Sequence, residues 1–104
     1  MINTANKKYV YFSEVDKFGY YFQCISFTEE ECRQAMIEEY VKTYINWNKT
    51  NPQIAYEWMQ EHKDDPDIEE RDEYYEYKED AKYFEYFLDE LYVDKREINK
   101  VEWR

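Results

Sequence analysis

The stretch TEEECRQAMIEEYVKTYINW, residues 28–47, combines a helix start signal with a helical hydrophobic pattern. Thr28 and Glu31 have the spacing of a capping box, in which the hydroxyl accepts from the third helical amide and the carboxylate reaches back. The glutamates in between suit the positive end of a helix dipole. Apolar residues then recur at spacings of three and four, which predicts a helix that ends near Trp47. Its expected buried face consists of Met36, Ile37, Tyr40, Val41, Tyr44 and Ile45.

Two β-strand patterns precede this helix. Residues 8–14 and 19–27 are rich in Tyr, Val, Phe and Ile, and Gly19 is available for a turn that requires a positive φ. We therefore expect an antiparallel hairpin, with core-facing side chains at Val10, Phe12, Phe22 and Cys24.

A second helix is predicted after residue 51. Asn51 followed by Pro52 is typical of an N-cap and a first helical residue, and the helix should end near His62. Its expected inward residues are Ile54, Trp58 and Met59.

A third helical stretch follows the break at Pro66. Asp67 is expected to cap it, and Asp80 fits either one continuous helix or a second helix start. The buried stripe is predicted at Tyr74, Tyr77, Ala81, Phe84, Leu88 and Leu91. After Tyr92, a third strand beside the hairpin is indicated by Ile98, Val101 and Trp103.

The composition is compatible with one folded domain over residues 1–104. Leu, Ile, Val and Phe together make up 20 of the 104 residues, but 13 Tyr and 3 Trp supply further large side chains for a core. We predict an α+β fold, in which an N-terminal antiparallel hairpin packs with about three helices and a possible C-terminal third strand.

Several classes of function are excluded by residue content. A single glycine leaves no dinucleotide-binding, phosphate-loop or nucleophile-elbow motif, because each needs at least two glycines. The chain has no 18-residue apolar run, and its polar start has no secretory h-region, so we expect a soluble cytoplasmic protein. A net charge of −11 repels nucleic acid and anionic membranes and favours a basic partner.

No enzymatic or metal chemistry is expected. His62 is interpreted as a structural residue at a helix end, and Cys24 and Cys32 as reduced, partly buried thiols. The acidic run over residues 64–70 does not have the glycine that an EF-hand loop requires. We expect no catalytic residues, no metal ligands and no cofactor.

The acidity is concentrated in one segment. Residues 57–90 hold 15 acidic and 4 basic residues, a net charge of −11, while the rest of the chain sums to zero. A solvated helix face is the ordinary explanation of such a run, but solubility does not require this localisation. The predicted partner-binding residues are Glu57, Glu61, Asp64, Asp65, Asp67, Glu69, Glu70, Asp72, Glu73, Glu76, Glu79 and Asp80.

The spacing of these charges is similar to that of DNA. Eleven acids lie in residues 67–90. At about 1.5 Å per residue, a helix distributes them at roughly one per 3.3 Å, against about 3.4 Å per phosphate in one DNA strand. Nearby exposed tyrosines, Tyr75, Tyr83 and Tyr86, would add contacts to Arg or Lys of a partner.

The acid-and-tyrosine run DIEERDEYYEYKED, residues 67–80, together with the size and acidity, resembles the small acidic DNA mimics of bacteria and phages. The closest resemblance is to the twelve-kilodalton bacterial type that binds the histone-like protein HU. The resemblance implies competition with DNA for a basic binding site, without cofactor or catalysis. We expect the protein to be a monomer or a weak dimer. Alternatives are a phage-type inhibitor of a restriction, CRISPR or repair enzyme, an acidic adaptor for basic peptides, and a small carboxylate-based hydrolase.

Overall fold

A computed structural model describes residues 8–17 and 19–98 of the chain. Val101 and Trp103, which were predicted to belong to the last strand, lie outside the described residues. Along the chain the elements are β1 (Lys8–Lys17), β2 (Tyr20–Ser26), α1 (Glu29–Asn48), α2 (Pro52–Glu61), the 3-10 turn η2 (Ile68–Glu70), α3 (Asp72–Glu90) and β3 (Val93–Ile98). The predicted α+β class, the N-terminal hairpin, the three helices and the third strand are all confirmed.

The chain divides into two compact units. The sheet unit contains the residues up to Ile37 and those from Leu91 onward, and the helical unit contains residues 38–90. Helix α1 contributes its first part to the sheet unit and its remainder to the helical unit.

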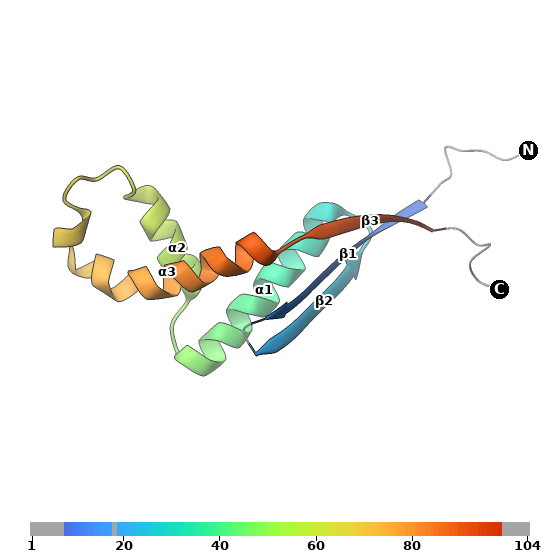
Figure 1. The fold of residues 1–104 in the computed structure, drawn as a ribbon, viewed down its shortest axis with the longest axis horizontal. Helices are drawn as coiled ribbons and strands as arrows, with labels where there is room; N and C mark the ends of the chain where they lie inside the picture. Colours follow the sequence, from blue (N-terminus) through green and yellow to red (C-terminus); the bar gives the residue numbers. More distant parts are fainter. Residues whose placement is uncertain (1–7, 18, 99–104) are drawn as a thin grey trace, which may run out of the picture. The chain divides into compact units, whose positions relative to one another are not determined.

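The sheet unit contains three antiparallel strands in the order β2-β1-β3, with β1 in the centre (Figure 1). Gly19 has a φ of 79° in the turn between β1 and β2, a conformation that glycine adopts without a steric penalty. One face of the sheet buries Val15 and Phe22, and Cys32 and Met36 of α1 are also buried in this unit.

The prediction for the buried face of β1 is wrong. The structure buries Ser13 and Val15, whereas Val10 and Phe12 lie on the opposite face and are half-buried. Ser13 tolerates burial because its hydroxyl donates to the backbone carbonyl of Tyr92 at 2.7 Å. Phe12 on the outer face is covered in part by the guanidinium of Arg96, 4.5 Å from its ring centre. In β2, Phe22 is buried as predicted and Cys24 is half-buried.

The predicted N-caps at Thr28 and Asn51 are confirmed. The amide of Glu31 donates to the Thr28 hydroxyl at 3.1 Å, and the Asn51 side-chain oxygen accepts from the amides of Gln53 and Ile54 at 2.9 and 3.1 Å. These bonds satisfy amides that have no partner inside the helix. Helix α2 then buries Pro52 and Ala55.

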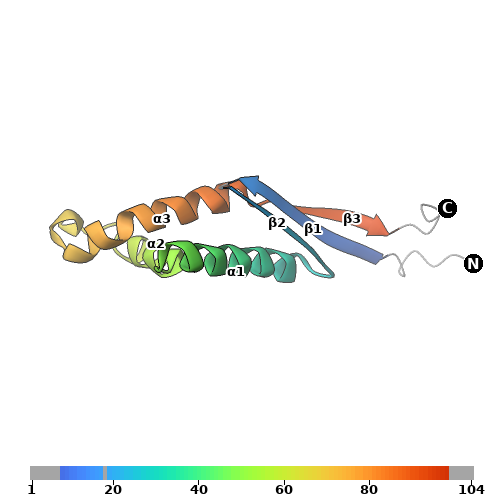
Figure 2. The same ribbon diagram turned by 90° about the horizontal axis from the view of Figure 1, so that it is seen from below.

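Aromatic rings form the interior of the helical unit. The ring of Tyr40 stacks on that of Phe87 at 4.2 Å, and Phe84 lies against Tyr40 and Tyr56. Figure 2 shows α3 on one side of the helical unit and the second part of α1 on the other, and the stacked rings of Tyr40 and Phe87 connect the two helices. The buried residues of α3 are Ala81, Phe84 and Phe87, and Leu91 directly after the helix is also buried.

Some details of the predicted helix faces are wrong. Burial on α3 centres on Phe87 rather than Leu88, which is half-buried, and Ile45 and Ile54 are exposed. The aromatic rings of α1, α2 and α3 already fill this interior, so the two isoleucines remain at its rim. Asp67 precedes η2 without a side-chain cap, and α3 starts later, at Asp72. From there α3 is one continuous helix, with no restart at Asp80.

Candidate protein-interaction surface

The charge follows the division into two units. The helical unit holds 17 acidic and 6 basic residues, a net charge of −11, and the sheet unit holds 8 of each, a net charge of zero. The whole formal charge of the protein therefore belongs to the helical unit. All twelve predicted partner-binding residues lie in this unit.

These twelve residues, called the acidic surface below, come from consecutive parts of the helical unit. Glu57 and Glu61 are on α2, Glu69 and Glu70 on η2, and the others lie in the connecting loop or on α3. Ten of the twelve are exposed, and the exceptions are Asp65 and Asp80. The structure thus places most of the predicted site in water, as recognition by a partner requires.

Asp65 shapes the loop between α2 and α3. One of its oxygens accepts from Nε of Arg71 at 2.7 Å, and the other accepts from the backbone amide of Asp67 at 2.9 Å. The hydrogen bond from Arg71, followed by the one from the Asp67 amide, lowers the pKa of Asp65. Asp65 is therefore engaged within the protein and has less of its charge to offer to a partner.

Asp80 is also engaged within the protein. It is half-buried, and its Oδ1 accepts from the hydroxyl of Tyr44 on α1 at 2.5 Å. This bond joins α1 to α3, and it explains why an aspartate that suits a helix start lies in the middle of a helix. Asp80 acts as a packing residue rather than as part of the exposed surface.

On one side of α3, exposed acidic residues are followed by exposed tyrosines. Asp72, Glu76 and Glu79 follow one another at spacings of four and three, and Tyr83, Tyr86 and Glu90 continue the same alternation. Residues at these spacings lie on one side of a helix. The six are all exposed and form a line about 27 Å long at about 1.5 Å per residue. Glu90 is not among the predicted residues, although its spacing from Tyr86 places it on this line.

The two lysines of α3 lie against aromatic rings. Nζ of Lys78 is 5.4 Å from the ring centre of Tyr75 and 5.8 Å from that of Tyr74. Nζ of Lys82 is 5.7 Å from the ring centre of Tyr86. Because both lysines are exposed, the contacts are weak, but they place both cations beside the line of acids rather than on it.

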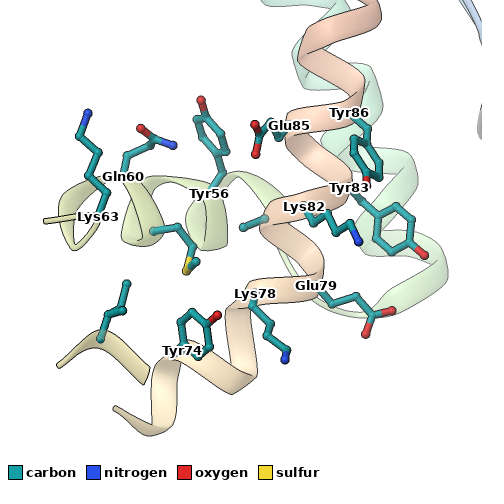
Figure 3. Close-up of a pocket in the computed structure, with 13 residues that line it drawn as sticks. Tyr56, Gln60, Lys63, Tyr74, Lys78, Glu79, Lys82, Tyr83, Glu85 and Tyr86 are labelled. Carbon is teal, nitrogen blue, oxygen red and sulfur yellow. The ribbon is translucent and has the colours of Figure 1, made fainter. Parts of the chain in front are cut away.

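An open pocket of about 790 Å³ lies between α2 and α3 (Figure 3). Its carboxylates are Glu79 and Glu85, and Figure 3 shows Glu85 pointing toward Tyr56 of α2 while Glu79 points away from α2. Glu79 is the one member of the acidic surface that lines the pocket. The other eleven residues of the acidic surface lie outside this pocket.

His62 occupies the position expected of it. Its Nδ1 lies 2.9 Å from the carbonyl oxygen of Trp58, and its ring stacks on the Trp58 ring at 4.2 Å. Its backbone amide donates to the same carbonyl at 3.1 Å, so His62 closes the end of α2.

Within the described residues, no group of three His, Cys, Asp or Glu side chains is arranged to hold a metal ion. The helices of the described part of the chain also include none that is long and apolar enough to cross a membrane. Comparisons with protein-family models, with curated proteins and with solved structures find no match to this chain.

Proposed function

We propose that this protein is a DNA mimic, and that its acidic surface occupies the basic DNA-binding site of a bacterial protein and competes there with DNA. The observation that carries the proposal is the distribution of charge. The net charge of −11 belongs to the helical unit, and ten of the twelve predicted carboxylates are exposed. A charge required for solubility alone would not be confined to one unit.

The arrangement on α3 supports the proposal further. Asp72, Glu76 and Glu79 are in line and exposed, and carboxylates at such spacings repel one another. This repulsion lowers the stability of the isolated helix and is relieved when a cationic surface binds. A Lys- or Arg-rich groove that binds this line contacts carboxylates in place of DNA phosphates. Binding of the protein to the groove should therefore weaken with salt, as DNA binding does.

The partner that we propose is the histone-like protein HU. It is the partner of the bacterial DNA mimics that the chain resembles, and its DNA-binding site is the basic surface that the acidic surface would occupy. A phage-type inhibitor of a restriction, CRISPR or repair enzyme would use the same surface and the same physical mechanism.

One observation favours a second candidate, an acidic adaptor for basic peptides. Tyr83 and Tyr86 continue the line of acids, and both are exposed. Exposed tyrosine rings provide contact area and cation–π attraction for Arg or Lys side chains. An adaptor would depend mainly on these two anchors, whereas a DNA mimic would depend mainly on the carboxylates.

The proposal is tested by competition for a labelled DNA duplex bound to HU at low salt. Increasing amounts of the protein should displace the duplex, and direct binding of the protein to HU, measured without DNA, should weaken as salt is raised. If no duplex is released at any protein concentration at low salt, HU is not the partner. The same assay with a nuclease or repair enzyme in place of HU then tests the phage-type alternative.

A further inference from the structure

The two outer strands of the sheet differ in how they are protected. β3 is at one edge and has the sequence VDKREI, in which four of six residues are charged. β2 is at the other edge and has the sequence YYFQCIS, with no charged residue and no proline. Charges and prolines are what proteins commonly use to prevent an edge strand from pairing with another chain. β3 has this protection, and β2 does not.

The outer face of β2 also exposes apolar side chains. Tyr21 is 54% exposed and Ile25 is 63% exposed, and Phe27 directly after the strand is 75% exposed. In the sheet formed by the described residues, β1 is the strand hydrogen-bonded to β2, so the other side of β2 is an edge of this sheet. An uncharged edge with exposed apolar residues is suited to the addition of another strand.

We propose that β2 is a self-association edge, at which it pairs antiparallel with β2 of a second copy of this chain. The charge distribution favours a second copy at this place. The sheet unit is neutral, so two copies can approach through it, whereas the two helical units, each with a net charge of −11, repel one another. The proposal does not depend on the function proposed above.

The strand is complementary to itself in this orientation. When two copies of β2 pair about a twofold axis at Gln23, Tyr21 of each copy lies opposite Ile25 of the other copy. All three residues are exposed on the same face of the strand. Aromatic and β-branched residues in directly opposed positions are a favourable cross-strand pair. Two three-stranded sheets would then become one continuous six-stranded sheet.

The resulting dimer should be weak and dependent on concentration. Interfaces that bury less than about 1,200 Å² are typical of transient association, and a seven-residue strand provides a small interface. Added salt should strengthen the dimer, because it screens the repulsion between the helical units.

Sedimentation equilibrium from micromolar to millimolar concentration tests the proposal on the whole chain. We expect a monomer–dimer equilibrium that Ile25→Lys weakens by about tenfold or more, because the new charges lie within the paired edge. Gln60→Lys is the matched control, since it adds the same charge at an exposed site on α2, away from the paired edge, and should not weaken the dimer. Circular dichroism verifies that both variants are folded.

Hydrogen exchange of the unaltered protein provides a second readout. Amides of β2 should become better protected as the protein concentration rises, while amides of β3 should not change. A chain that stays monomeric at millimolar concentration overturns the proposal, as does protection that increases at β3 instead of β2. Equal weakening of the dimer by Ile25→Lys and Gln60→Lys would also overturn it.

Discussion

The hydroxyl of Tyr44 on α1 donates to Oδ1 of Asp80 on α3 at 2.5 Å. The two residues are 36 positions apart in sequence, and the rings of Tyr40 and Phe87 stack between the same two helices. One carboxylate of the predicted acidic surface therefore stabilises the helical unit, and its exposed neighbours remain available for a partner.

Removing the Tyr44 hydroxyl should destabilise the protein. Tyr44→Phe leaves the half-buried Asp80 carboxylate without its donor, and we expect a loss of about 1–3 kcal/mol in the free energy of unfolding. Urea denaturation measures this loss. Tyr86→Phe is the control, because Tyr86 is exposed and its hydroxyl has no comparable role in packing. Equal stability of Tyr44→Phe and the unaltered protein would show that the bond contributes nothing.

Alkaline pH should unfold the helical unit. Burial raises the pKa of Tyr40 from 10.0 to about 12, and burial together with the Asp80 hydrogen bond raises the pKa of Tyr44 as well. Both phenols are neutral when folded. Their contribution to stability is complete below the unfolded value of 10.0 and declines as the pH rises above it. Denaturation monitored by circular dichroism should show falling stability above pH 10, and this fall should be smaller in Tyr44→Phe.

Asn51→Ala should weaken the start of α2. It removes the oxygen that accepts from the amides of Gln53 and Ile54, at an expected loss of about 1 kcal/mol in the free energy of unfolding. Asn51→Asp keeps an acceptor at the same position and should retain most of the stability. If Asn51→Ala and Asn51→Asp are equally unstable in urea, loss of the cap is not the reason for the lower stability of Asn51→Ala.

The sequence predicts the elements well, because their signals are local. The Thr28 and Asn51 caps, the turn at Gly19 and the helical spacing of apolar residues all act over a few positions. The face of β1 that is buried is not a local property. Burial of Ser13 depends on the carbonyl of Tyr92, which lies 79 positions away, and the outer position of Phe12 is tolerated because Arg96 covers its ring.

The candidate site is predictable to the same degree. Exposure of ten acids follows from a run of charges on helices, which sequence reveals directly. The internal roles of Asp65 and Asp80 cannot be predicted in this way. They depend on Arg71 across a loop and on Tyr44 of another helix. Where an acid finds a partner within the fold, its charge is no longer part of the surface.

Tyr83 and Tyr86 distinguish mimicry from an adaptor role. In a DNA mimic, Tyr83→Ala with Tyr86→Ala should weaken partner binding less than removal of three carboxylates from the acidic surface, because charge supplies most of the attraction. Titration calorimetry with the same partner compares the two sets of variants. A larger loss of affinity from the tyrosine substitutions would favour the adaptor.

The most direct test of the account compares two triple variants that change the net charge equally. Glu69, Glu73 and Glu76 belong to the acidic surface, whereas Glu29, Glu30 and Glu31 are exposed at the start of α1 in the sheet unit. Each set is changed to Gln, which retains the capping pattern at α1. The measurement is displacement of a labelled duplex from HU at low salt. We predict that the first variant competes at least severalfold less well and that the second competes like the unaltered protein. Equal competition by the two variants would contradict the claim that the acidic surface is the binding site.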